Sequence, residues 1–410
     1  MSRKKSVKNN NKGFEREEDL KQAVLFVSLF FITVFIVTFN IFQNKHSGVF
    51  FRNLTSSVEE VNNSAVNDVS YNGNFGKDKD SKKLYPLPEN KIYFGAFPDF
   101  GDTEDVVSAD KIADFNNLVN KKMDWVYFSN NWGVDGIVFP KEKVEIIAGT
   151  NAIPFIRMMP RKVMGDSQDK TFSLQKIIDG EFDEQLAQYA RDVRAYGDKI
   201  LLDFGVEMNG DWFPWAGVNN GGAETEGFGA PDKADGPERF IAAYRHIVDI
   251  FKAEEVDNVT WFFHPDISSH PEADWNDLRN YYPGDDYVDW VGVSAYGTQN
   301  VHDDEYIWFY DLMDKNDHKL LDFTKNKPIA LLEFGVTDNY PQISKGEWFN
   351  DMFDYVLDPD SPIQFRAISV WHENWTRPDE SQATLRLDSS ADSLKTFKSR
   401  ISDLRFNHQE

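Results

Sequence analysis

The residues between positions 201 and 215 combine a carboxyl group with aromatic rings in a way that suits chemistry on sugars. The stretch begins as an apolar run of strand length and changes at Glu207, after which turn-forming residues alternate with aromatic ones. A carboxyl group at a strand end can transfer a proton, and indole rings can stack on the apolar faces of pyranose rings. A glutamate that caps a turn beside core tryptophans gives the same local pattern, so the other strand ends must decide between the two interpretations.

Four further apolar runs of strand length end in residues that fit the same chemistry. They deliver, in chain order, His264, Tyr296, Glu333 and Trp371. Any one of these residues alone could be structural. Two glutamates, a tyrosine and a tryptophan at the expected strand ends together favour a catalytic site.

The elements that must position these residues alternate between short apolar runs and segments with helical periodicity. Strands are expected at Ile92–Ala96, Trp125–Phe128, Ile153–Met158, Ile200–Phe204, Val259–Phe263, Trp290–Ser294, Ile329–Leu332 and Ala367–Val370. Helices are expected at Ala109–Asn120, Phe182–Tyr196, Pro237–Glu254, Gly346–Val356 and Ser393–Leu404. The alternation predicts a (β/α)8 barrel, and a doubly wound sheet is disfavoured because no glycine-rich phosphate loop follows the first strand.

In such a barrel the fourth and seventh strands lie on opposite sides, so Glu207 and Glu333 would face each other across the mouth. A separation of about 5–5.5 Å between the two carboxyl groups is typical of retaining glycosidases. One carboxylate would attack the anomeric carbon, and the other would protonate the leaving oxygen and later activate water. Repulsion between the two groups would keep the acid protonated near neutral pH.

Composition narrows the class of substrate. The chain has 44 Lys and Arg against 68 Asp and Glu, a net charge of −24, which disfavours nucleic acid, anionic lipid and strongly anionic polymers as partners. A neutral polysaccharide fits this charge, and eleven tryptophans among 15% aromatic residues fit stacking on sugars. With no cysteine, the chain has no disulfide framework, zinc–thiolate site or thiol nucleophile.

The N-terminal part predicts a membrane anchor. Ala23–Phe42 gives twenty residues without a charge, about 30 Å as a helix, after a leader that holds seven Lys and Arg against four Asp and Glu. The expected organisation is a basic cytoplasmic tail (1–21), a single transmembrane span (22–43), a flexible linker (44–89) and an extracytoplasmic barrel (90–410). A cleaved signal peptide is the alternative, but the apolar run is long and no small-residue cleavage site follows it.

At this point the motifs carry a family resemblance. The stretch EMNGDWFPW at 207–215 and the strand LLEFG at 331–335 resemble the acid/base and nucleophile signatures of glycoside hydrolase family 26. Further similar segments, which extend the resemblance over about 90–405, are YFGAFPD at 93–99, DGEFDEQLAQYA at 179–190, NVTWFFHPD at 258–266 and DWVGVSAYG at 289–297. The resemblance implies a (β/α)8 barrel, a retaining mechanism, and no cofactor or metal in catalysis. Members of this family are mostly endo-β-1,4-mannanases, with some mixed-linkage β-glucanases and xylanases.

The same resemblance implies roles for single residues. Glu207 would be the acid/base, Glu333 the nucleophile and Tyr296 a hydrogen-bond donor to the nucleophile. The implied substrate-binding residues are Trp212, Trp215, His264, Tyr296 and Trp371, with Trp371 as the floor for the cleaved sugar and Trp212 and Trp215 on the aglycone side. The sequence departs from the family where Val206 replaces a histidine and Asp203 an arginine.

The sequence therefore predicts a membrane-anchored retaining endo-β-glycosidase that acts on a neutral polysaccharide, β-1,4-mannan first of all. A mixed-linkage β-glucanase or a xylanase is the alternative within the same class of enzyme. A carbohydrate-binding barrel without turnover is the alternative from another class, although a binding protein has no need of two opposed carboxylates. The sequence leaves the oligomeric state open.

Overall fold

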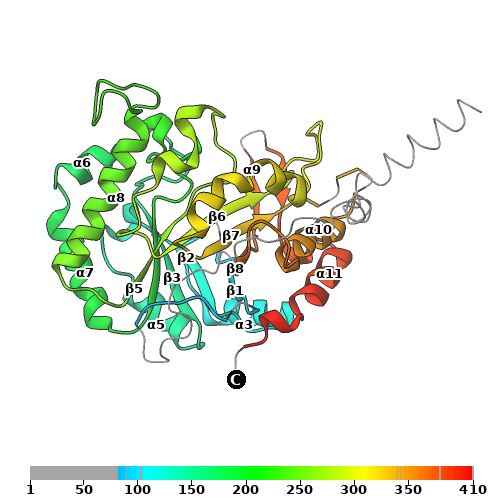
Figure 1. The fold of residues 1–410 in the computed structure, drawn as a ribbon. Coiled ribbons are helices and arrows are strands. Elements are labelled where there is room, and N and C mark those ends of the chain that lie inside the picture. The colour runs from blue at the N-terminus through cyan, green and yellow to red at the C-terminus, as the bar shows by residue number, and fades with distance from the viewer. Residues whose placement is uncertain are drawn as a thin grey trace, which may run out of the picture. The chain divides into compact units, whose positions relative to one another are not determined.

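The eight predicted strands form a closed parallel barrel, in which each strand pairs with its sequence neighbours and β1 also pairs with β8 (Figure 1). The computed structural model describes residues 82–88, 90–101, 104–338, 340–341, 343–377 and 380–408. The strands are β1 (Tyr93–Phe97), β2 (Trp125–Asn131), β3 (Ile153–Met159), β4 (Ile200–Phe204), β5 (Val259–Phe263), β6 (Trp290–Tyr296), β7 (Ile329–Gly335) and β8 (Phe365–Trp371). The predicted (β/α)8 architecture is confirmed.

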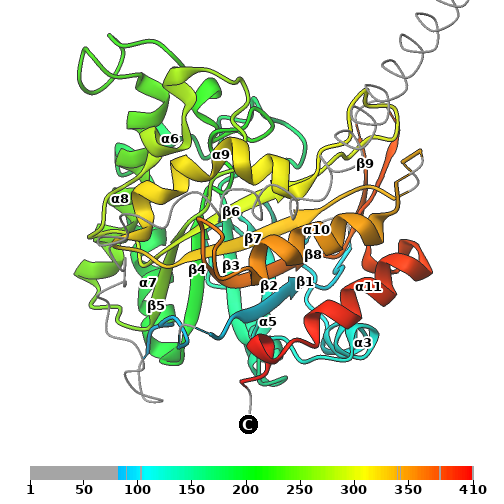
Figure 2. The ribbon, with the colours of Figure 1, turned by 45° about the vertical axis from the view of Figure 1, so that its right-hand side comes forward.

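Helices alternate with the strands and cover the outside of the barrel, as Figures 1 and 2 show. They are α3 (Ala109–Val119), α4 (Trp132–Asp135), α5 (Lys141–Ala148), α6 (Leu174–Ile178), α7 (Asp183–Tyr196), α8 (Asp235–Ala253), α9 (Phe309–Thr324), α10 (Lys345–Leu357) and α11 (Ala391–Ile401). Polar side chains set where several of them begin. The Ser344 hydroxyl accepts from the Glu347 amide while the Glu347 side chain accepts from the Ser344 amide, a capping box that satisfies two donors at the start of α10.

The strands are buried on both faces, which explains why they appear in the sequence as continuous apolar runs instead of alternating patterns. Strands β4 and β5 have the predicted bounds, whereas most of the others continue past the apolar run. In β2, Ser129 and Asn130 stay in register with Arg157 and Met158 of β3. These polar extensions carry side chains toward the mouth of the barrel, where a parallel barrel places its chemistry.

Residues 82–88, which the sequence analysis assigned to the linker, pack against the start of β5 and β6. The Leu84 amide donates to Thr260 Oγ1 over 2.8 Å, and Trp290 Nε1 donates to the Leu84 carbonyl over 3.0 Å. Lys82 and Lys83 form ion pairs with Asp257 and Asp289. The predicted linker boundary at 89 is therefore too late, because a buried leucine and its hydrogen bonds tie this segment to the barrel.

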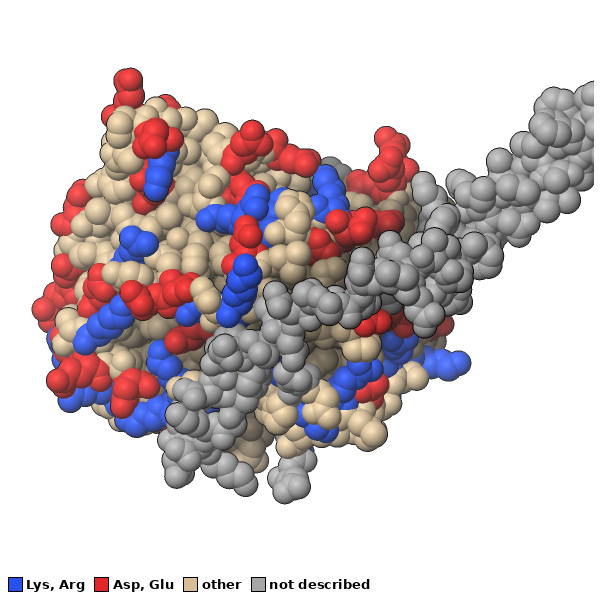
Figure 3. Space-filling view, in the orientation of Figure 1, with Lys and Arg blue, Asp and Glu red and all other residues tan. Residues whose placement is uncertain are grey.

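The predicted transmembrane span at 22–43, the tail before it and most of the linker lie outside the described residues. Within the part of the chain that the structure does describe, no helix has both the length and the apolar character needed to cross a bilayer. On the face of the barrel in Figure 3, Asp and Glu side chains are widely spread, with Lys and Arg among them. This distribution agrees with the acidic composition.

Candidate active site

Glu207 leaves the end of β4 through a backbone turn of unusual geometry. Gly205 and Glu207 both have a left-handed φ, of 64° and 55°. The Glu207 amide donates to the His264 carbonyl over 2.7 Å, and Trp212 Nε1 donates to Glu207 Oε2 over 2.8 Å. A left-handed glutamate costs about 1–2 kcal/mol relative to an ordinary backbone conformation. The turn accepts this cost and directs a buried carboxyl group, 7% exposed, into the mouth of the barrel.

Glu333 reaches the same mouth from β7 on the opposite side. The Tyr296 hydroxyl donates to Glu333 Oε2 over 2.9 Å, which is the contact that the family resemblance implied. A shift in register between Val293 and Ser294 of β6 brings Ser294 opposite Glu333, so the bulge sets where Tyr296 ends. Oε1 of Glu333 is buried and accepts no hydrogen bond among the described residues, and the guanidinium of Arg157 lies 3.3 Å from it as an ion pair.

The electrostatics connect the two glutamates. Burial raises the pKa of Glu333 well above its ordinary value, and the charge of Glu207 raises it further. The guanidinium of Arg157 and the hydroxyl of Tyr296 act in the opposite direction and lower this pKa. The charge of Glu207 therefore acts on the protonation of Glu333, which agrees with two carboxyl groups at the same mouth of the barrel.

Arg157 is a site residue that the sequence analysis missed. It lies in the middle of β3 and is 3% exposed, with Nη2 3.3 Å from Glu333 Oε1 and Nη1 3.5 Å from Glu104 Oε2. Its guanidinium also stacks on the ring of Trp371, 4.8 Å from the centroid. A lone arginine inside the apolar run IPFIRMM was the available signal, since a charge that is buried in a strand needs a partner.

The two departures from the family have clear structural positions. Asp203 is the cross-strand partner of Arg157 in the β3–β4 register, so the expected arginine of β4 is replaced by an acid beside an arginine of β3. Asp203 Oδ2 accepts from the Tyr127 hydroxyl over 2.6 Å and lies 2.9 Å from Nδ1 of His264. Val206 is fully buried in the hydrophobic core.

Two predicted substrate-binding residues lie in other places than expected. His264 is enclosed, with 0% of its side chain exposed, and its Nε2 lies 3.0 Å from Ser294 Oγ, so its ring contacts other residues of the protein instead of an open surface. Trp215 is 1% exposed, and its Nε1 donates to the Val206 carbonyl over 2.8 Å. Phe213 stacks on it at 4.5 Å, and Phe213 is the partly exposed member of that pair.

The remaining predicted aromatics stand beside the carboxyl groups. Trp212 is 36% exposed and combines a free ring surface with its hydrogen bond to Glu207, which suits an aglycone contact. Trp371 ends β8 and is only 3% exposed, because Phe97 stacks on it at 4.1 Å and the Arg157 guanidinium lies over the ring at 4.8 Å, so little of the ring is open for stacking on a sugar. Its Nε1 is buried without a hydrogen-bond partner among the described residues. A buried donor without a partner is expected where a ligand hydroxyl completes the site.

A third carboxyl group lies close to Glu207. Asp266 follows β5, and its backbone amide donates to Asn209 Oδ1 over 2.9 Å while Asn209 Nδ2 donates back to the Asp266 carbonyl over 2.8 Å. Burial first, and then the charge of Glu207, raise the pKa of Asp266 well above its ordinary value. Its strand-end position was visible in the sequence, but its interaction with Glu207 was not.

Comparison with known proteins agrees with this geometry. The sequence profile described as Glycosyl hydrolase family 26 matches residues 162–380, just over half of the chain. "Endoglucanase H" of Acetivibrio thermocellus is 26% identical over 297 residues, which cover 72% of this chain and 29% of that protein. A "Mannan endo-1,4-beta-mannosidase" of Bacillus subtilis strain 168 is 22% identical over 255 residues, 62% of this chain and 59% of that protein. The chain thus matches less than two thirds of the length of either relative.

Solved structures show the same fold. The catalytic domain of an endo-β-1,4-mannanase from Bacillus sp. JAMB-750 superposes with a TM-score of 0.54 at 17% identity and covers 77% of this chain and 86% of that one. A family 26 protein from Muricauda sp. superposes with a TM-score of 0.52 at 16% identity, with 77% and 87% covered. At these identities the likeness concerns the barrel.

Proposed function

The chain belongs to glycosyl hydrolase family 26, and from this premise we propose that it is a retaining endo-β-1,4-mannanase tethered to the cytoplasmic membrane. The observation that carries the proposal is the pair of buried carboxyl groups at the ends of β4 and β7, where the charge of Glu207 raises the pKa of Glu333. The membrane tether rests on the twenty uncharged residues of Ala23–Phe42 and the basic leader before them.

The proposed reaction has two displacements at the anomeric carbon. In the first, Glu333 Oε1 attacks from one face while Glu207 donates its proton to the glycosidic oxygen, and the sugar–oxygen bond breaks as the glycosyl–enzyme ester forms. In the second, Glu207 takes a proton from water as that water attacks the same carbon and Glu333 leaves as a carboxylate. Two inversions restore the original β configuration.

The surrounding residues prepare Glu333 for this work. A nucleophile must be ionised, yet burial favours its neutral form. Arg157 and Tyr296 counteract burial by placing a positive charge at one carboxyl oxygen and a hydroxyl donor at the other. Trp212, which donates to Glu207 Oε2, fixes the direction of the acid. Pre-organised contacts of this kind act on the charge that develops in the transition state.

A mixed-linkage β-glucanase is the second candidate, and a specific observation favours it. The match to the endoglucanase covers 72% of this chain, against 62% for the mannosidase. The sugar units of mannan and glucan differ in the orientation of the hydroxyl on C2, the carbon next to the anomeric carbon, and mixed-linkage glucan also contains β-1,3 bonds. The sequence departs from the family next to the acid/base, since Val206 and Asp203 stand where the family has a histidine and an arginine, and both residues are buried.

A panel of soluble β-mannan, glucomannan, mixed-linkage β-glucan and β-1,4-xylan tests the proposal. We expect reducing ends to appear fastest on mannan, with a rapid fall in polymer length that marks endo action. Proton NMR of the first product should show the β anomer, and an α product would exclude the retaining mechanism. Faster turnover of mixed-linkage glucan would establish the second candidate, and binding without cleavage of any polymer would indicate a carbohydrate-binding barrel.

A further inference from the structure

A groove lies outside the site that holds the two glutamates. It is formed by the loop 223–234 after β4, the outer face of α8, and the segment 274–282, which contains the short 3-10 helices η2 (Asp274–Asn276) and η3 (Leu278–Tyr281). Its volume is about 950 Å³, near the upper end of the range of small-molecule sites, roughly 300–1,000 Å³. None of the residues assigned to the cleavage site lines it.

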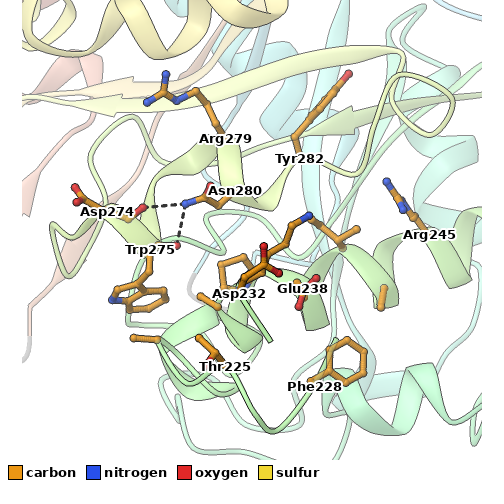
Figure 4. Close-up of a pocket in the computed structure, with 16 residues that line it drawn as sticks. Thr225, Phe228, Asp232, Glu238, Arg245, Asp274, Trp275, Arg279, Asn280 and Tyr282 are labelled. Atoms are coloured by element: carbon orange, nitrogen blue, oxygen red, sulfur yellow. Dashed lines mark hydrogen bonds between the residues drawn. The ribbon is translucent and has the colours of Figure 1, made fainter. Parts of the chain in front are cut away.

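Aromatic rings occur at several points along this groove. Trp275 and Phe228 lie on opposite sides, with Asp232 and Glu238 between them, and Tyr282 lies farther along (Figure 4). Trp275 and Phe228 are both partly exposed. Arg239 stacks on Phe228, with its guanidinium 5.0 Å from the ring centroid, which stiffens that ring. Rings with an open face beside polar side chains suit the apolar and hydroxylated sides of a sugar.

The charge of the lining favours a neutral ligand. Three acids are matched by three bases along the groove: Asp232, Glu238, Asp274, Lys233, Arg245 and Arg279. The arginines are already held, because Arg279 forms ion pairs with Asp277 and Asp322, and Arg245 Nε donates to the Pro283 carbonyl. A phosphate or uronate would meet no excess of positive charge here. A polyhydroxylated neutral chain would find both donors and acceptors.

The groove is built on the same framework as the catalytic turn. Asn276, the neighbour of Trp275, donates from Nδ2 to the Asn209 carbonyl over 2.9 Å. Asn280 Nδ2 donates to the carbonyls of Asp274 and Trp275, which fixes the backbone that carries the tryptophan. A polymer that lies in the groove is therefore held by the segment that also braces the loop of Glu207.

We propose that this groove is an accessory binding site for the neutral polysaccharide on which the enzyme acts. The assignment of the ligand rests on the proposed function, whereas the groove and its lining do not. An accessory site raises the local concentration of polymer near the mouth without touching the reacting bond. Its effect is therefore confined to long or insoluble substrates, where attachment to the polymer limits the rate.

The test uses the full-length protein with Trp275→Ala, Phe228→Ala and both together. Tyr310→Ala on α9 is the matched control, since it removes an aromatic ring that is 38% exposed outside the groove. Binding is measured by affinity electrophoresis in gels that contain mannan or mixed-linkage glucan, and kcat/KM is measured on a short soluble oligosaccharide. Thermal unfolding of each variant checks that the fold is retained.

We expect the double variant to bind polymer about tenfold more weakly and to lose activity on insoluble polysaccharide by a similar factor. Its kcat/KM on the short substrate should stay within about twofold of the wild type. Trp275→Phe should recover part of the binding, because it restores a ring. Tyr310→Ala should behave as the wild type does.

Unchanged binding in the double variant would overturn the proposal, as would an equal loss on short and long substrates. A concentration-dependent dimer that the double variant abolishes would assign the groove to a second copy of this chain and would also overturn it. A wild-type protein that binds polymer through the groove but cleaves none would refute the proposed function and leave the groove assignment standing. A protein that neither binds nor cleaves any polymer would refute both.

Discussion

At the scale of single residues, the protonation of Glu333 depends on a balance between burial and Arg157. Burial raises the pKa of this carboxyl group, and the charge of Glu207 adds to the increase, while the arginine lowers it. A nucleophile with a raised pKa is protonated, and inactive, at the acid end of the pH range. The acid limb of kcat/KM in the free enzyme should therefore report this group.

Arg157→Met should move that acid limb to higher pH. Removing the guanidinium deletes a cause that lowers the pKa of Glu333, so the carboxyl group stays protonated up to a higher pH. We expect kcat/KM near neutral pH to fall by about 10- to 100-fold, and a part of the loss should return as pH is raised. Arg161→Met is the control, since Arg161 is also buried and pairs with Glu104. If both variants shift the acid limb of kcat/KM equally, the shift does not come from the position of Arg157 beside Glu333.

The division of work between Glu207 and Glu333 gives a second prediction. Glu207→Ala should still form the glycosyl–enzyme in a burst on an aryl glycoside with an acidic phenol, because that leaving group needs no proton. Added azide should then relieve the slow second step and give a β-glycosyl azide. Glu333→Ala should show no burst, and any azide adduct should have the α configuration. The opposite pattern would exchange the two roles.

The sequence predicted those side chains whose position follows from a strand end alone. Glu333 and Tyr296 lie on paired strands, so their contact follows once the barrel is assumed. Trp215, which was expected on the aglycone side, is 1% exposed, and the chain reaches it after two left-handed residues, whose φ apolar patterning does not reveal. Arg157 was missed because the middle of an apolar strand was treated as core.

At the scale of elements, the turn after β4 holds strain that serves the site. Glu207 has a left-handed φ of 55°, a conformation that glycine adopts without strain. Hydrogen bonds from the Glu207 amide to His264 and from the Gly210 amide to Glu207 maintain this conformation. The strained backbone directs the carboxyl group into the site. The same conformation lowers the stability of the fold, so the residue favours catalysis at the expense of stability.

Glu207→Gly should therefore be more stable than Glu207→Ala. Both variants lose the carboxyl group, so the difference isolates the backbone, and relief of the left-handed strain outweighs the extra entropy of glycine by about 0.5–1 kcal/mol. Urea unfolding of the two variants measures this difference. Ala187→Gly in α7 is the control and should destabilise by about 1 kcal/mol, because that position is helical. A more stable Glu207→Ala would mean that the turn changes its conformation once the side chain is lost.

The strands were easier to predict than their ends. Apolar runs gave the bounds of β4 and β5, but β2 continues for three residues beyond the expected Phe128, through Ser129 to Asn131. Backbone pairing with β3 maintains that extension, and hydrogen bonds between backbones leave no trace in hydrophobic patterning. The bulge in β6, which aligns Ser294 with Glu333, escaped prediction for the same reason.

At the scale of the whole molecule, the point where the chain joins the barrel affects how a tether would work. Lys82–Leu84 attach at the beginning of β5 and β6, through Asp257, Thr260 and Trp290. Glu207 and Glu333 lie toward the carboxyl ends of their strands, which is the opposite end of the barrel. A tether that continued from this point would leave the mouth free to receive a polymer.

The proposed anchor then predicts which side of the membrane the barrel occupies and how it behaves when released. In the proposed topology the basic leader would keep the N-terminus in the cytoplasm, so protease added to intact spheroplasts should remove the barrel and spare the first 21 residues. Because the mouth lies opposite the attachment point, the released barrel should keep its kcat/KM on a soluble oligosaccharide within about twofold of the anchored form. A cytoplasmic enzyme followed in the same samples controls for lysis. The anchor would be contradicted if the barrel became accessible to protease only after lysis, or if the full-length chain were recovered from the soluble fraction. A large change in kcat/KM on release would contradict the inference that the mouth is free in the anchored form.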